Sequence, residues 1–138
     1  MDSLLSINPY AKIVSMGDFN DDPIDTSIKQ VLMTEKSRIS VPLKGLYNPM
    51  EKMFENGLGT LAYNDSWNLF DQIIISKEWL KSDYSEYRFY KAGIFNKPYL
   101  TQAQGRFKGY PFKSFTNGSF SGGYSDHFPG YVYLITEL

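Results

Sequence analysis

Short apolar runs alternate along the chain with polar, glycine-rich connections. Residues 11–16 form an apolar, partly β-branched run that ends in the polar run 17–23, which predicts a buried strand followed by an acidic loop. From about residue 25 or 26 to residue 33, a capping side chain is followed by apolar residues that share one face, which predicts a helix.

The middle of the chain predicts a second helix and a long strand. Within residues 48–57, an Asn that can cap precedes a Pro, a Glu three residues after the Asn, and a terminal Gly, which together predict a short helix. Residues 66–76 are almost continuously apolar, as is typical of a strand covered on both faces, but the run contains the carboxylate of Asp71. Residues 76–80 then predict one capped helical turn.

The last third of the chain predicts two strands and a long loop. Residues 84–95 alternate aromatic with polar side chains, which predicts a half-exposed strand, and residues 131–136 predict the final strand. Between them, residues 96–123 are rich in glycine, proline and aromatic residues, and connections of this length are usually functional or mobile. Because no repeat or linker interrupts the pattern, we expect residues 1–138 to form one unit.

Composition limits the classes of function. The 138 residues, 42% of them hydrophobic, are enough to bury the core of one domain. A net charge of -1 gives the protein no overall field that attracts nucleic acid or an anionic membrane, so phosphate recognition has to be local. The absence of cysteine excludes disulfides and thiolate metal sites, and no stretch approaches the roughly 20 apolar residues that span a bilayer. These properties assign no compartment.

Polar insertions interrupt the apolar strands at residues 17–20, at Asp71 and at residues 125–127. Burying an unpaired carboxylate costs several kcal/mol, so each acid is expected to be paired, hydrogen-bonded or bound to a metal ion. Carboxylates are the ligands that Mg²⁺ and similar ions prefer. His127 is the only histidine, and imidazole is suited to proton transfer near neutral pH.

These insertions carry a resemblance to a known family. Gly-Asp-Phe-Asn at residues 17–20, Asp71 within a strand, and Ser-Asp-His-Phe-Pro at residues 125–129 resemble, in order and spacing, the C-terminal motifs of the endonuclease/exonuclease/phosphatase superfamily, which has the deoxyribonuclease I-like fold. The resemblance covers roughly residues 11–136. It implies an α/β (α+β) fold, namely half of a four-layer α/β/β/α sandwich, with a mixed, mostly antiparallel sheet and helices on one face.

The resemblance also implies roles for individual residues. Asp18 would position the attacking water or a metal ion, and Asn20 would bind the scissile phosphate and stabilise its transition state. Asp71 would lie at the metal and phosphate site. Asp126 would orient His127 or ligate a metal ion, and His127 would act as general base or as a phosphate-binding electrophile. The implied reaction is in-line attack of water on a phosphoester.

The implied cofactor is Mg²⁺ or Mn²⁺. Its expected ligands are the carboxylates of Asp18, Asp71 and Asp126. Asn20 and Asp71 are also expected to contact the substrate, and Arg106 and Lys108 in the long loop are further candidates for substrate binding. The substrate class stays open among nucleic acid, lipid and small phosphoesters.

The resemblance is to the second half of the family domain. Family members are usually about twice as long, and their first half supplies an Asn, a metal-binding Glu and a second His that have no counterpart here, whereas residues 1–7 resemble the tail of the helix that leads into the first of these strands. We therefore expect a C-terminal portion of the domain that is inactive alone. An exposed apolar sheet face would pair with the missing half or with a second copy.

Local readings compete with these assignments. Asp18 and Asn20 also suit a plain turn, Asp71 could be a buried acid satisfied by backbone or a Lys, and residues 125–127 could be a capped turn. The neighbouring Asp21 and Asp22 are expected to be solvated. The basic and aromatic run 106–115 could stack on a base or sugar, or merely cover the sheet edge.

Two functions from different classes follow. The motifs taken together favour a phosphoester hydrolase, either a nuclease or phosphodiesterase or a phosphatase. The alternative is a non-catalytic interaction or scaffold domain that keeps the half-fold, which the missing Glu and His would favour.

Overall fold

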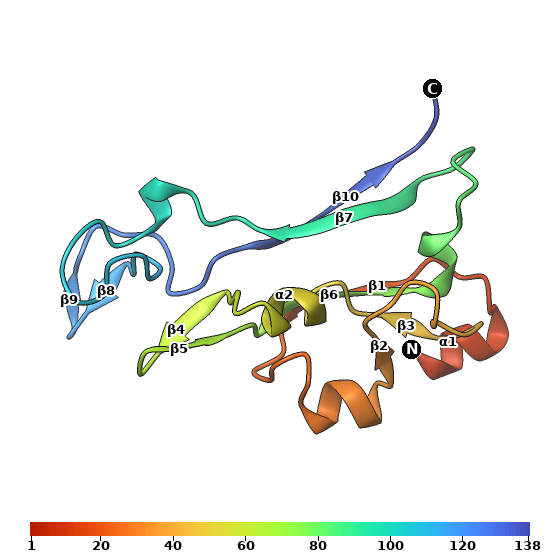
Figure 1. The fold of residues 1–138 in the computed structure, drawn as a ribbon, viewed down its shortest axis with the longest axis horizontal. Helices are drawn as coiled ribbons and strands as arrows, with labels where there is room; N and C mark the ends of the chain where they lie inside the picture. Colours follow the sequence, from red (N-terminus) through yellow and green to blue (C-terminus); the bar gives the residue numbers. More distant parts are fainter.

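The computed structural model describes residues 1–138, except for the side chain of Asp2. Two β-sheets lie one above the other in an elongated molecule, and two helices lie below the lower sheet (Figure 1). These helices are α1 (Asp2–Ile7) and the π-helix η1 (Ser27–Val31). The helix predicted between residues 25 and 33 is therefore present, but it is one short π-helical turn, and the side chain of Thr26 at its start does not cap it as predicted.

The lower sheet has four strands in the order β1-β6-β3-β2. They are β1 (Val14–Asp18), β6 (Asp71–Ser76), β3 (Leu46–Tyr47) and β2 (Thr34–Glu35). β1 and β3 pair antiparallel with β6, whereas β2 pairs parallel with β3. The sheet is mixed and mostly antiparallel, as predicted.

Strand β6 is covered on both faces. Ile74 points to the helical side, where it packs in a buried cluster with Leu5 and Ile28. Ile73 and Ile75 point to the opposite side and belong to the second buried cluster. Successive strand residues face opposite sides of a sheet, so the continuous apolar run reflects two cores rather than one.

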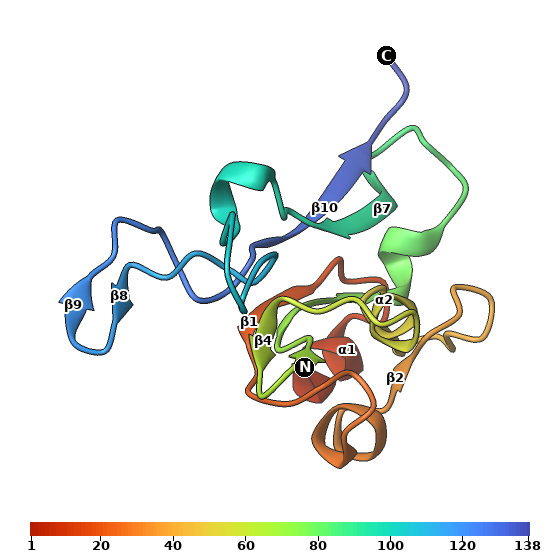
Figure 2. The same ribbon diagram turned by 60° about the vertical axis from the view of Figure 1, so that its left-hand side comes forward.

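The upper sheet closes the second core. It consists of β7 (Arg88–Ile94) and β10 (Gly130–Ile135), which pair antiparallel. Phe89 is buried in the cluster with Ile73 and Ile75, and Val132 packs against it. Figure 2 shows the same layering from a second direction. The fold class predicted from the sequence, α+β with helices on one face of the lower sheet, is confirmed.

The face of the lower sheet that was expected to be exposed is largely covered by β7 and β10 of the same chain. Two apolar areas stay open. One is the edge strand β1, on which Val14 is 39% and Met16 74% exposed. The other is the side of the upper sheet that faces away from the core, where Tyr90 and Tyr133 are each 51% exposed.

Shorter elements complete the chain. They are α2 (Glu51–Glu55), β4 (Leu61–Tyr63), β5 (Ser66–Asn68), η2 (Lys77–Leu80), η3 (Pro98–Leu100), β8 (Phe115–Thr116) and β9 (Ser119–Phe120). No helix among the described residues is both long and apolar enough to cross a bilayer.

The strand predicted over residues 66–76 is in fact two strands. Its first part, β5, pairs with β4 through a two-residue turn in which Asn64 and Asp65 both have positive φ angles, of 48° and 61°. Such turns match the twist of a hairpin. The side chain of Asp22 accepts the backbone N–H of Leu69 directly after β5, and the chain then resumes as β6.

Two other predictions differ from the structure. Ser76 does not cap η2, because its Oγ donates to the carbonyl oxygen of Ala11 and accepts from the N–H of Ile13. Residues 96–123 also contain the β8–β9 hairpin, whose turn residues Asn117 and Gly118 have φ angles of 50° and 79°. Asn-Gly is the usual sequence of this turn, so the hairpin has a local cause.

The burial of β6 predicts a difference between two isoleucines. Ile74 is 0% exposed and Ile39 is 94% exposed. Replacing Ile74 by Ala should lower the free energy of unfolding by about 3 kcal/mol, because it removes buried methyl groups and leaves a cavity. Ile39→Ala should change it by less than about 0.5 kcal/mol. Urea denaturation measures both, and equal effects would contradict the burial of β6.

Candidate functional site

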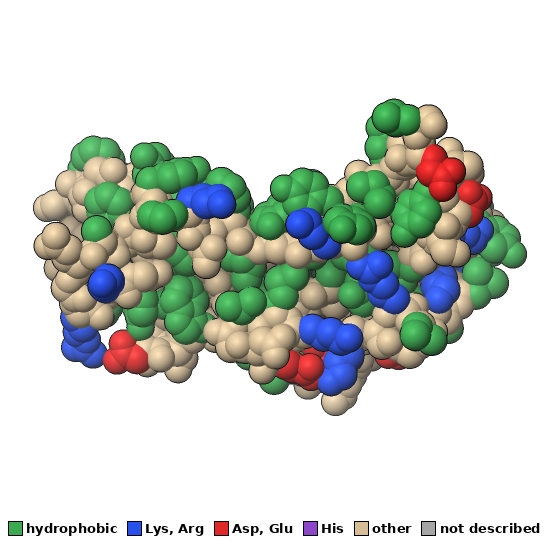
Figure 3. Space-filling model, turned by 45° about the horizontal axis from the view of Figure 1, so that its top comes forward, with side chains coloured by type: hydrophobic (Ala, Val, Ile, Leu, Met, Phe, Trp, Pro, Cys, Tyr) green, Lys and Arg blue, Asp and Glu red, His purple; other side chains and the backbone are tan. Residues whose placement is uncertain are grey.

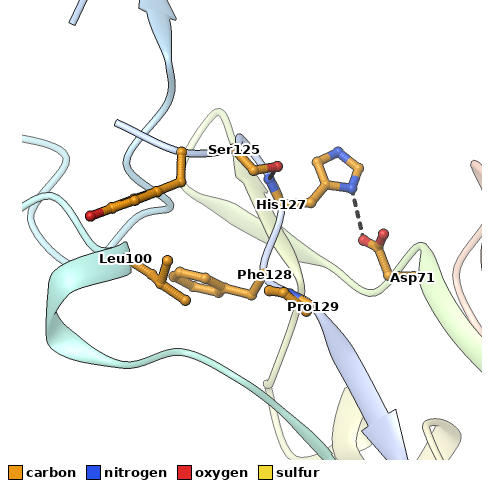
Figure 4. Close-up of a pocket in the computed structure, with 7 residues that line it drawn as sticks. Asp71, Leu100, Ser125, His127, Phe128 and Pro129 are labelled. Carbon is orange, nitrogen blue, oxygen red and sulfur yellow. Dashed lines mark hydrogen bonds and ion pairs between the residues drawn. The ribbon is translucent and has the colours of Figure 1, made fainter. Parts of the chain in front are cut away.

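A histidine and an aspartate from the two sheets meet at one end of the sandwich. Nδ1 of His127 lies 2.7 Å from Oδ2 of Asp71, and both side chains are about one quarter exposed, at 24% and 26%. Figure 4 shows the second ring nitrogen of His127 turned away from Asp71. A carboxylate in this position accepts a hydrogen bond from Nδ1–H and leaves Nε2 available to another group.

The strand pattern places the two side chains together. Asp71 is the first residue of β6 and shares a face with Ile73 and Ile75, the face that the upper sheet covers. His127 lies three residues before β10, in the segment that enters the upper sheet. At Gly130 a Cβ atom would approach the carbonyl oxygen of Asp71 to 3.3 Å and the Met50 side chain to 3.1 Å, so the glycine lets the two sheets approach closely here.

Thr60 holds the two chain segments in register. Its backbone oxygen accepts the N–H of Phe128 at 2.7 Å, and its Oγ1 accepts the N–H of Asp71 at 3.3 Å. Thr60 is completely buried, so these contacts are shielded from water. It was not a predicted site residue, because nothing local in the sequence distinguishes a threonine that bridges two distant segments.

Asp18 faces Asp71 across the β1–β6 pair. The two residues are partners in the antiparallel register, and the next pair, Phe19 with Phe70, is joined by an N–H to O bond of 2.9 Å. Hydrogen-bonded and open pairs alternate, so Asp18 and Asp71 form an open pair, with Cα atoms typically about 4.5 Å apart. Like charges at this spacing repel, and a cation would relieve the repulsion.

Asn20 lies in a tight turn beside Asp18. Its φ angle is 53°, and its N–H donates to Oδ1 of Asp18 at 2.9 Å. The predicted pair is therefore next to Asp71, and the turn is also the local structure that the alternative reading expected. Both side chains are exposed.

Asp21 and Asp22 were expected to be solvated. In the structure both are only partly exposed, and their side chains accept hydrogen bonds from other parts of the chain. Oδ1 of Asp22 accepts the N–H of Leu69 at 2.6 Å, and its Oδ2 accepts the side-chain amide of Asn68 at 2.8 Å. Asp21 accepts the hydroxyl of Ser27 at 2.6 Å. These bonds fix the acidic turn against the start of β6, so Asp22 positions both Asp18 and Asp71.

A buried chain of amides supports the same turn from below. Asn48 Nδ2 donates to Oε1 of Gln72 at 2.7 Å, and Nε2 of Gln72 donates to the backbone oxygen of Asp21 at 2.6 Å. The Oδ1 atom of Asn48 accepts the N–H of Met50, just before α2. Asn48 and Gln72 are 0% and 1% exposed, and their polar groups are satisfied. The prediction that Asn48 caps α2 is wrong, because the N-cap residue is Met50 and no side chain caps the helix; Asn48 instead links the start of α2 to the acidic turn.

Two cavities flank Asp71. One of about 230 Å³ is also lined by His127, Ser125 and Leu100, and one of about 200 Å³ is also lined by Met16 and Gly130. The larger cavity is where the free nitrogen of His127 could meet a ligand.

The other predicted residues make no contact with this centre that resembles those of Asp71 and His127. Asp126 directly precedes His127, but it is exposed and lines neither cavity beside Asp71. Arg106 pairs with Asp65 at 3.4 Å, and Lys108 is exposed in the same loop. The structure therefore brings together Asp18, Asn20, Asp71 and His127, and places the two basic residues elsewhere.

Two carboxylates at the centre have donor atoms for a metal ion. Asp18 uses Oδ1 for the turn and Asp71 uses Oδ2 for His127, and within the described part of the chain their other oxygens have no hydrogen-bond partner. No group of three or more His, Cys, Asp or Glu side chains among the described residues surrounds a common metal position. Mg²⁺ often takes one or two carboxylates and several waters. The pair therefore fits a largely hydrated ion.

Comparison with known proteins agrees with this geometry. The model of one protein family, described as the Endonuclease/Exonuclease/phosphatase family, matches residues 1–136, a range that contains the acidic turn, Asp71 and His127. No curated protein and no solved structure gives a match. The chain therefore belongs to the Endonuclease/Exonuclease/phosphatase family, a phosphoesterase-type superfamily, as its motifs predicted.

Proposed function

We propose that this chain provides the histidine–aspartate part of a metal-dependent phosphoester hydrolase site. The observation that carries the proposal is the 2.7 Å contact between His127 Nδ1 and Asp71 Oδ2 at a cavity mouth, beside a second carboxylate. The site needs no nucleophilic side chain, since water is the nucleophile.

His127 acts as the general base. Asp71 holds the Nδ1 proton, so the neutral ring presents the lone pair of Nε2 to a water molecule in the cavity. The water oxygen attacks phosphorus, its proton passes to Nε2, the ester P–O bond breaks, and the leaving oxygen takes up a proton from solvent. Asp71 also stabilises the imidazolium that forms. In its protonated form, His127 would instead act as an electrophile that binds a phosphate oxygen.

Asp18 and Asn20 act on the phosphate side of the centre. Asn20 can donate its side-chain amide to a phosphate oxygen, because the turn fixes its backbone beside Asp18. Asp126, next to His127 and exposed, is assigned only as a candidate metal ligand or positioning group. Preorganised donors of this kind are usually the main source of stabilisation in phosphoryl transfer.

Members of the family are generally dependent on divalent metal ions. In this chain Asp18 and Asp71 would hold Mg²⁺ or Mn²⁺. When bound, such an ion neutralises charge that develops on the phosphoryl group. Its binding would also offset the repulsion between the two facing carboxylates, which is a reason for the pair to be retained in the fold.

We further propose that the chain is inactive alone. The family's first half contributes an Asn, a Glu and a second His to the site, and the resemblance finds only the second-half motifs here. A further strand that completes the domain would pair with the exposed edge of β1. An interaction or scaffold domain is the second candidate, and the same exposed edge favours it.

The activity prediction compares the chain alone, the extended chain and two variants of the extended chain. With Mg²⁺ or Mn²⁺ and bis-p-nitrophenyl phosphate, we expect the chain alone to be inert and the chain extended by its upstream coding sequence to cleave the diester. In the extended form, His127→Ala and Asp71→Asn should each lower kcat/KM by about 100-fold or more, because the base or its orienting partner is lost.

The matched control for Asp71→Asn is Asp83→Asn, which changes the same chemical group in an exposed turn. Asp83 accepts only a local N–H from Ser85, so its loss should leave kcat/KM unchanged. An extended form that folds and binds Mn²⁺ but never cleaves any diester would remove the hydrolase proposal and leave the scaffold candidate.

A separate prediction concerns self-association through β1. An exposed apolar edge strand invites pairing with another strand, and a Lys placed on it opposes such pairing. Light scattering should give a mass above the 15.9 kDa monomer for the chain, and Met16→Lys should lower it. Ile39→Lys, on an apolar residue that is more exposed than Met16 and lies outside any strand, should not. A folded monomer at high concentration would refute the pairing.

A further inference from the structure

We propose that the long loop and the β4–β5 hairpin together form a binding surface for single-stranded nucleic acid, with one pocket that takes a base. The binding does not depend on the hydrolysis proposed above, whereas the identification of the bound strand as substrate rests on it. Three observations carry the proposal: a pocket with aromatic walls, a segregated positive charge, and a fixed connection to His127.

The pocket lies between the hairpin and the loop. Its volume is about 340 Å³, and its walls include the rings of Phe107, Phe115 and Tyr63, which are 52%, 62% and 67% exposed. Side-chain amides of Asn64 and Gln102 lie among its lining residues. Aromatic faces stack on any base, and amides can bond to base edges, so the chemistry suits a planar, polar ring.

The charge of this region is hidden in the total. Residues 87–125 contain six Lys or Arg and no Asp or Glu, although the whole chain carries -1. Four of them, Lys97, Arg106, Lys108 and Lys113, lie in the long loop. The other two are on β7, where Arg88 is buried and pairs with Glu86 and Lys91 lies outside the loop. Lys113 lines the pocket itself. The left end of the face shown in Figure 3 has Lys or Arg side chains among hydrophobic ones. Such a mixture favours a polyanion that also carries rings.

The surface is held by an anchor at the hairpin turn. Tyr110 donates its hydroxyl to Asp65 at 2.9 Å, and Arg106 pairs with the same carboxylate. The hydrogen bond from Tyr110, then that from Arg106, holds the pKa of Asp65 below its usual range, and the same bond raises the pKa of Tyr110. Asp65 is therefore ionised at neutral pH and can accept both hydrogen bonds, which link the hairpin turn to the loop.

A line of rings joins the surface to the hydrolytic centre. Tyr110 lies edge-on to Trp67, with ring centroids 5.6 Å apart, and Trp67 stacks on Phe128 at 6.1 Å. Phe128 is buried and follows His127 directly. A base held in the pocket would therefore lie within reach of the same strand that enters the cavity at His127. A flexible single strand can span both, whereas stacked duplex bases cannot enter a pocket.

Binding of a short fluorescein-labelled oligothymidylate to the chain tests the proposal. Fluorescence anisotropy is measured at low salt with EDTA, so that metal and cleavage play no part. Phe107→Ala should weaken binding about tenfold, because it removes one stacking face. Lys113→Ala should weaken it less and lower the slope of log K against log salt by about 0.7.

Two matched controls separate the surface from general effects. Tyr87→Ala removes an exposed ring at the other end of the upper sheet, and Lys52→Ala removes an exposed cation on α2. Neither should change the affinity by more than about twofold. Circular dichroism of each variant confirms that a loss of binding is not a loss of fold.

Several results would overturn the proposal. These are no binding of the oligonucleotide, equal losses in Phe107→Ala and Tyr87→Ala, or competition by polyphosphate that is as strong as by oligonucleotide and unaffected by Phe107→Ala. Tighter binding of a duplex would also overturn it. If the strand binds as expected and the extended enzyme cleaves bis-p-nitrophenyl phosphate but not the strand with Mn²⁺, the bound strand is not the substrate, and the binding surface and the hydrolase proposal both stand. If it cleaves neither, the hydrolase proposal fails and the binding surface stands.

Discussion

The rest of the structure depends on the burial of β6 on both faces. Ile74 and Ile75 are each completely buried, on opposite sides of the same strand. A shift of one residue would exchange the two faces, so the packing fixes the register of β6 against β1. That register also decides where Asp71 points. Its carboxylate lies on the face of Ile73 and Ile75, toward the segment that brings His127, and directly opposite Asp18.

The polar residues around Asp71 then remove the remaining freedom. Asp22, Thr60 and Gln72 each bond a backbone group of a segment that carries or adjoins a site residue. Buried polar groups are costly when unpaired, so a network in which they are satisfied favours one arrangement. The acidic turn is therefore rigid before any ligand binds. Electrostatic stabilisation depends on such preorganisation, because no donor has to be reoriented during the reaction.

The sequence was sufficient for the fold class and for the family, but not for the contacts that position the candidate site residues. The apolar run before Ser76 and the lone acid within it predicted a buried strand and a residue that required a partner. Whether that partner was metal, backbone or His127 could not be read locally. Thr60 and Asp22 were missed because their roles consist of contacts to chain 11 and 47 residues away. The two-residue strands β2 and β3 are too short to show a period.

The total charge does not show where the charges lie. The net charge is -1 because the acidic residues, which lie before residue 87 and after residue 125, offset all the cations, six of which lie between these two groups of acids. Charge acts over about 10 Å in salt solution, so its local distribution matters more than its sum. The β4–β5 hairpin is where this distribution meets the chemistry. Thr60, directly before β4, clamps the segment of His127, and Trp67 in β5 supports the rings of the basic surface. One hairpin therefore sets the distance between the basic surface and His127. Under the proposed function, a strand that occupies both would be held at a fixed register relative to the bond to be cleaved.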